Sequence, residues 1–135
     1  MPSKKILIVD DDADVVLFLS TVLQDHGYET IEARNGLEGL ERATSDCPDL
    51  ILLDLMMPQK SGIALLSDLN KDDTLKEIPV IMVTGVSGET GIDLEAFFKR
   101  DVKGDPERND LRPEGYIEKP VDPQKLLKML KEVLS

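Results

Sequence analysis

Short apolar runs, most of them ending at a polar residue, alternate along this sequence with stripes of apolar residues at helical spacing. The runs have the length of buried strands, and the stripes have the 3.6-residue period of amphipathic helices. Strands that alternate with helices favour right-handed crossovers and an open parallel sheet covered on both faces. The sequence therefore predicts an α/β fold with a doubly wound sheet.

Five strands and five helices account for the pattern. The strands are expected at Lys5–Val9, Tyr28–Ala33, Asp49–Leu53, Ile78–Val83 and Tyr116–Ile117. The helical stripes run from Val15 to Leu23, Leu37 to Ala43, Ile63 to Leu69, Leu94 to Val102 and Leu126 to Leu134. We expect the five parallel strands in the order 2-1-3-4-5, the flavodoxin-like arrangement, in which ligands bind outside the carboxyl ends of the strands.

The segment between the fourth and fifth strands is enlarged. Thirty residues (115 − 84 − 1) separate Thr84 from Gly115, whereas one helix with two short loops needs roughly 14–26. Residues 103–114 are polar and contain Gly104, Pro106 and Pro113, a composition typical of a long loop. Either a surface insertion or a dedicated partner contact would explain it.

Composition limits the classes of function. The chain has 135 residues and a net charge of −11, which disfavours direct binding to nucleic acid and favours a cation as ligand. It has one cysteine and no apolar run long enough to span a membrane, so we expect a single cytoplasmic domain over residues 1–135 with no attached output domain. Cys47 and His26, the only residues of their types, are interpreted as a bystander thiol and a helix-terminal side chain.

Polar side chains that could take part in catalysis or bind a metal follow four of the predicted strands. Asp10 and Asp11 follow the first strand, Asp54 the third, Thr84 the fourth and Lys119 the fifth. Because the first and third strands are neighbours in the predicted order, their three aspartates converge. Carboxylates so close to one another must either hold protons or bind a cation. Hard oxygen ligands around a small site suit Mg²⁺.

Four strings at these strand ends resemble the receiver domain of response regulators in two-component signal transduction. They are Ile8-Val9-Asp10-Asp11-Asp12, Leu53-Asp54-Leu55-Met56-Met57-Pro58, Val83-Thr84-Gly85 and Tyr116-Ile117-Glu118-Lys119-Pro120. The resemblance spans nearly the whole chain, and the strings occur in the family's order.

The resemblance implies a role for each site residue. Asp54 would be the phosphoacceptor that attacks a phosphohistidine, and Asp10, Asp11, Asp54 and the backbone carbonyl of Met56 would hold Mg²⁺. Lys119 would neutralise charge on the transferring phosphoryl oxygens, aimed by a cis bond to Pro120. Thr84 would bond the new phosphoryl group, and Thr84 and Tyr116 would together form the conformational switch.

The same resemblance implies a stand-alone receiver rather than an enzyme acting on other molecules. Its expected partners are a histidine kinase or phosphotransfer protein and an unknown downstream protein. The alternative role within this family is a phosphorelay intermediate that passes its phosphate to a histidine phosphotransfer protein. Met56 and Val86 are apolar where many relatives carry polar side chains, which leads to the hypothesis of a long-lived acyl phosphate.

Two other classes of protein share parts of this pattern. A phosphatase or phosphotransferase with an aspartyl nucleophile also gathers acids at strand ends, but the short loops after the first and third strands leave little material for its substrate pocket. A flavodoxin-like cofactor binder shares the sheet but needs a phosphate-cradling loop after the first strand. Three consecutive aspartates, Asp10, Asp11 and Asp12, would repel that phosphate.

Overall fold

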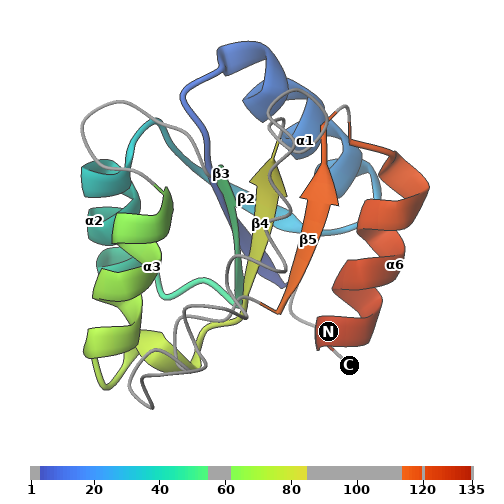
Figure 1. Cartoon of the computed structure of the whole chain (residues 1–135). Coiled ribbons are helices and arrows are strands. Elements are labelled where there is room, and N and C mark those ends of the chain that lie inside the picture. Colours follow the sequence, from blue (N-terminus) through green and yellow to red (C-terminus); the bar gives the residue numbers. More distant parts are fainter. Residues whose placement is uncertain (1–3, 55–61, 85–113, 120, 135) are drawn as a thin grey trace.

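Five strands form one parallel sheet in a computed structural model that describes residues 4–54, 62–84, 114–119 and 121–134 (Figure 1). The strands are β1 (Lys5–Val9), β2 (Glu29–Ala33), β3 (Leu50–Asp54), β4 (Val80–Thr84) and β5 (Gly115–Glu118). Their order in the sheet is β2-β1-β3-β4-β5, and all four neighbouring pairs are parallel. The predicted fold and strand order are confirmed.

Helices cover both faces of this sheet. They are α1 (Ala13–Asp25), α2 (Gly36–Asp46), α3 (Gly62–Lys71) and α6 (Pro123–Leu134), with a short 3-10 helix, η1 (Leu75–Glu77), before β4. Helices α2 and α3 lie on one face and α1 and α6 on the other (Figure 1). Successive β1 residues enter different cores, since Ile6 packs on the α1/α6 side and Leu7 on the α2/α3 side.

The central position of β3 explains why its last residue is buried. All five of its residues are buried, because β1 and β4 flank it and helices cover both faces. Asp54 stands opposite Val83 on β4, and Leu53 stands opposite Val9 on β1. The residue that follows Val9 is Asp10, so the sheet register brings Asp10 alongside Asp54.

The ends of α1 follow the chemistry of their residues. Asp12 is the N-cap, and its carboxylate accepts from the amides of Asp14 and Val15 at 2.9 and 3.4 Å. Gly27 has φ +88°, the left-handed conformation expected for a residue that ends a helix. His26 is the C-cap, with Nδ1 2.9 Å from the carbonyl oxygen of Val22.

The predicted start of the fourth strand was wrong by two residues. Strand β4 begins at Val80 rather than Ile78. The amide of Ile78 donates to the carbonyl of Leu75 and closes η1, and Pro79 has no amide hydrogen. Neither residue can therefore donate to the sheet. The short helix η1 itself was not predicted; the Asp72 carboxylate accepts from the amides of Thr74 and Leu75 and so initiates it.

Some predictions fall outside the described part of the chain. They are the fourth helical stripe, residues 103–113 of the expected loop, and the residues Met56, Gly85, Val86 and Pro120. Among the helices that the structure describes, none has the length and apolar character needed to cross a membrane.

Candidate functional site

Three carboxylates meet at the carboxyl edge of the sheet. Asp10, Asp11 and Asp54 each offer an oxygen, and these oxygens all lie within 4.8 Å of one another. Asp10 is 2% exposed and Asp54 is 5% exposed, whereas Asp11 faces solvent. The predicted convergence of the three aspartates is confirmed.

Backbone contacts fix Asp10 in this cluster. Its amide donates to the carbonyl of Ala33 at 3.0 Å, which extends the pairing of β1 with β2 by one step. Its Oδ1 accepts from the amide of Asp12 at 2.9 Å. Its Oδ2 is buried and makes no hydrogen bond among the described residues. One Asp10 oxygen therefore supports the loop, while the other is left for an ionic partner.

Lys119 brings a positive charge to the cluster from the end of β5. Its Nζ lies 3.1 Å from Oδ2 of Asp10 and 3.7 Å from Oδ1 of Asp54, and its side chain is 25% exposed. These are ion pairs by distance, and the first does not have the angles of a hydrogen bond. Because β5 is separated from β3 by β4, Lys119 reaches across one strand to meet these acids.

The acids determine the protonation of Lys119. Burial by itself lowers the pKa of the ammonium, but the contact with Asp10 and the charges of Asp54, Asp10 and Asp12 outweigh burial. The pKa of Lys119 is therefore raised above its ordinary value. The lysine stays protonated at neutral pH and acts as a fixed positive charge.

The formal charge of the cluster fits a divalent cation. Three carboxylates and one ammonium sum to −3 + 1 = −2. A hard cation with oxygen ligands, such as Mg²⁺, balances this charge and would bind the buried Oδ2 of Asp10, which accepts no hydrogen bond from the described residues. The donor set at this edge is therefore compatible with magnesium.

Two further predicted site residues lie on neighbouring strands. The backbone of Thr84 ends β4 and stands opposite Glu118, at the same edge of the sheet as Asp54. Tyr116 is partly buried and packs against the core on the α2/α3 side, on the face opposite to its neighbour Ile117. The backbone of Thr84 is therefore at the same end of the sheet as the cluster. Tyr116 lies two residue pairs of the β4–β5 ladder before that end.

A recess beside the cluster was not predicted from the sequence. It lies between the start of α1 and the end of β2, has a volume of about 110 Å³, and is lined by Asp10, Ala13, Val16, Leu17, Glu32, Ala33 and Arg34. Arg34 directly follows β2, which is a neighbour of β1 in the sheet. The same search of strand ends that found Asp54 would have found Arg34 if the second strand had been included.

Comparison with protein families agrees with this geometry. The family model described as the response regulator receiver domain matches residues 6–102. That range contains Asp10, Asp11 and Asp54 and ends before β5.

Individual relatives match over almost the full length of the chain. It is 36% identical to the polar-differentiation response regulator DivK of Brucella anthropi, across 100% of this chain and 98% of that protein. It is 35% identical to the protein PilH of Pseudomonas aeruginosa, across 97% and 98%. Among solved structures, the chemotaxis protein CheY4 of Vibrio cholerae superposes with a TM-score of 0.80 at 30% identity, across 98% and 100%.

Proposed function

This chain belongs to the response regulator receiver family, and we propose that it accepts a phosphoryl group on Asp54 from a histidine kinase or phosphotransfer protein. In this proposal it works as a stand-alone cytoplasmic signalling domain that passes the state of Asp54 to a downstream protein. The observation that carries the proposal is the meeting of Asp10, Asp11, Asp54 and Lys119 at one edge of the sheet.

Asp54 is the carboxylate best suited to be the nucleophile. Asp10 already engages one oxygen with the amide of Asp12 and holds the other 3.1 Å from Lys119. Asp11 is exposed on the loop, whereas Asp54 is 5% exposed at the end of the central strand, where packing fixes its direction of attack. Lys119 lies 3.7 Å from its Oδ1, close enough to interact with a phosphoryl group attached there.

The reaction requires positioning and charge neutralisation more than covalent chemistry. A carboxylate oxygen of Asp54 attacks the phosphorus of a phosphohistidine; a P–O bond forms, the P–N bond breaks, and its electron pair passes to the imidazole nitrogen, which takes a proton from solvent. Bound Mg²⁺, held by Asp10, Asp11 and Asp54 with the Met56 carbonyl, would neutralise charge on the phosphoryl oxygens. Lys119 contributes a second fixed positive charge, and the Thr84 hydroxyl would bond the transferred group.

A small phosphodonor tests this proposal without any partner protein. We expect incubation with phosphoramidate and MgCl₂ to add one phosphoryl group to the wild-type chain, measured by intact mass. Asp54→Asn should gain none. Asp25→Asn, which changes an exposed aspartate at the end of α1, is the matched control and should react like the wild type. Phosphorylation of Asp54→Asn to the wild-type extent would contradict the assignment of Asp54.

The output of the domain is proposed to pass through Thr84 and Tyr116. Bonding of the Thr84 hydroxyl to the phosphoryl group would move the end of β4 and let Tyr116, which pairs with Met82 two residues earlier on that strand, change its burial. A phosphorelay intermediate would in addition return its phosphate to a histidine phosphotransfer protein. Loss of the mass increment on addition of such a protein would identify that role.

A further inference from the structure

The recess between α1 and β2 opens directly beside the acidic cluster, because Asp10 lines both. Its volume of about 110 Å³ is below the roughly 300–1,000 Å³ of pockets that hold small-molecule ligands. It has room for part of one side chain. Any protein that brings a phosphohistidine to Asp54 must cover this edge of the sheet, so the recess lies within the area that such a protein contacts.

The wall of the recess on α1 is apolar and without a partner among the described residues. Ala13, Val16 and Leu17 form it, and Leu17 is 66% exposed, more than any other large apolar side chain in the described part of the chain. The hydroxyls of Ser20 and Thr21, one turn further along, both donate to the carbonyl of Leu17 and are thereby turned back onto the helix. A helix that packs here would meet an apolar surface.

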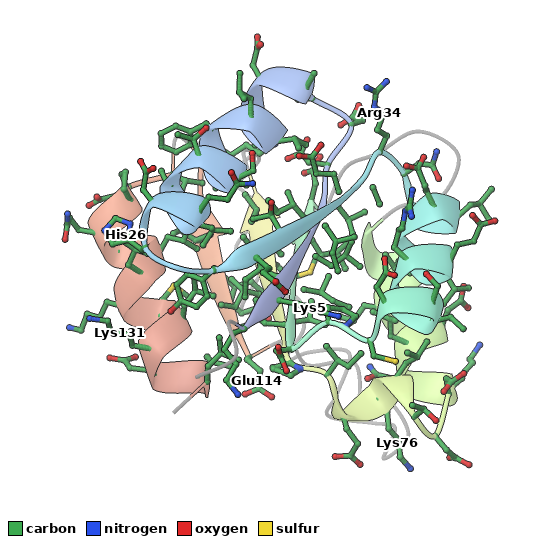
Figure 2. The ribbon with its side chains drawn as sticks, turned by 180° about the vertical axis from the view of Figure 1, so that it is seen from behind. Lys5, His26, Arg34, Lys76, Glu114 and Lys131 are labelled. Carbon is green, nitrogen blue, oxygen red and sulfur yellow. The ribbon has the colours of Figure 1, made fainter. Side chains whose placement is uncertain are left out.

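Arg34 stands on the opposite wall, from which it extends beyond the carboxyl end of β2 into solvent (Figure 2). The carboxylates of the cluster lie at this edge of the sheet, yet no ion pair joins Arg34 to another described residue. A guanidinium presents donors in a planar fork that matches a carboxylate with two parallel hydrogen bonds. Glu32, two residues earlier on the same wall, presents the opposite charge.

We propose that Arg34 selects the protein that donates the phosphoryl group, by pairing with a carboxylate on a donor helix whose apolar side chain enters the recess beside Leu17. The inference rests on the proposed phosphoacceptor function and adds the chemistry of the donor surface. Glu32 would repel a donor carboxylate placed one step away, so the two charges together fix the orientation of the donor helix. Donors with a basic residue opposite Arg34 would be rejected.

Phosphotransfer kinetics with two kinds of donor test this inference. The protein donor is an autophosphorylated histidine kinase from the same organism, chosen because it transfers its phosphoryl group to the wild type fastest. The small donor is phosphoramidate, which has no helix to dock. With the kinase, Arg34→Glu should lower kcat/KM about tenfold or more, chiefly through slower association that depends less on salt. With phosphoramidate, the rate should stay within about twofold of the wild type.

Arg42→Glu is the matched control, because Arg42 is an exposed arginine on α2 that does not line the recess and its replacement changes the net charge equally. It should keep the wild-type rate with both donors. Equal losses in Arg34→Glu and Arg42→Glu with the kinase would overturn the inference, since the effect would belong to net charge. A loss with phosphoramidate as well would assign Arg34 to the chemistry instead of donor choice.

A charge exchange provides the positive test. Each acidic residue on the kinase helix that carries or neighbours the histidine is replaced by arginine, and one such variant should restore transfer to Arg34→Glu while slowing transfer to the wild type. No restoration by any of them would overturn the pairing. Failure of wild-type protein to react with phosphoramidate would refute the phosphoacceptor function itself, a result distinct from all of these.

Discussion

Aspartates occupy two kinds of position in this chain, just before helices and at the ends of central strands. Asp12, Asp72 and Asp122 precede helices, and each carboxylate accepts from a backbone amide, at 2.9, 2.8 and 3.0 Å in the shortest contact of each. Asp10 and Asp54 end or follow strands, are almost fully buried, and lie beside a third carboxylate. The residue type is the same, but the surroundings differ.

The difference separates stability from function. The first amides of a helix have no hydrogen-bond partner within the helix. A carboxylate that accepts hydrogen bonds from them supplies that partner and so stabilises the fold. The clustered carboxylates repel one another, and the single ammonium of Lys119 leaves a formal charge of −2. That arrangement costs stability until a cation binds, and the cost is characteristic of a functional site.

Removal of Lys119 should have the largest effect. Lys119→Ala leaves three carboxylates with no described cation beside them, so the phosphoryl oxygens would meet uncompensated negative charge. We expect the rate of phosphorylation by phosphoramidate to fall roughly 100-fold. Lys125→Ala, at an exposed position on α6, should leave the rate unchanged. Timed intact-mass measurements distinguish the two, and equal rates would remove Lys119 from the mechanism.

Loss of one clustered carboxylate should weaken metal binding next most strongly. Asp11→Asn should raise the Kd for Mg²⁺ at least about tenfold, because an amide oxygen replaces a charged ligand. Asp14→Asn alters an exposed acid three residues away, in the first turn of α1, and should change the Kd by less than about twofold. Isothermal titration calorimetry measures both. Equal affinities would mean that the cluster binds Mg²⁺ without Asp11.

Most of the site could be predicted because parallel strands place their carboxyl ends on one edge. Asp10, Asp11, Asp54 and Lys119 needed only strand boundaries and a strand order. Strand order also explains why Lys119, 65 positions after Asp54 (119 − 54), lies within 4 Å of it. These inferences tolerate boundary errors of one or two residues.

The remaining features depend on tertiary packing. The recess lies between the start of α1 and the end of β2, where Leu17 stays exposed, and no pattern of apolar residues specifies how these two elements meet. The displaced start of β4 depends on Asp72, whose side chain initiates η1 and so commits the amide of Ile78. Both outcomes follow from the competition of particular hydrogen bonds and contacts, which sequence periodicity does not describe.

The two kinds of aspartate should differ in the sign of their effect on stability. In EDTA, Asp54→Asn should raise the free energy of unfolding by on the order of 1 kcal/mol, because the removal of its repulsion from Asp10 and Asp11 outweighs the loss of its attraction to Lys119. Asp122→Ala should lower it by about 1 kcal/mol, because the amide of Gln124 loses its partner at the start of α6. Urea titrations measure both.

Added Mg²⁺ sharpens that contrast. A cation that binds only the folded state stabilises the wild type by RT ln(1 + [Mg²⁺]/Kd), and Asp54→Asn, which should bind the cation more weakly, should gain less. Asp122→Ala should gain as much as the wild type, since its cap lies outside the cluster. If both substitutions lowered the free energy of unfolding in EDTA, the carboxylate of Asp54 would stabilise the folded state as a helix-capping carboxylate does. That result would contradict the expected difference in sign.

The smallest expected effect concerns pH. The raised pKa of Lys119 means that its folded state holds a proton more tightly than its unfolded state does. Its contribution to stability is therefore fully present below the unfolded pKa, about 10.4, and is lost as pH rises through the higher folded pKa. The difference in unfolding free energy between wild type and Lys119→Met should stay constant from pH 7 to about pH 9 and shrink only above pH 10. A difference that instead grew between pH 7 and 9 in urea titrations would mean that burial, rather than Asp10 and Asp54, determines the pKa of this lysine.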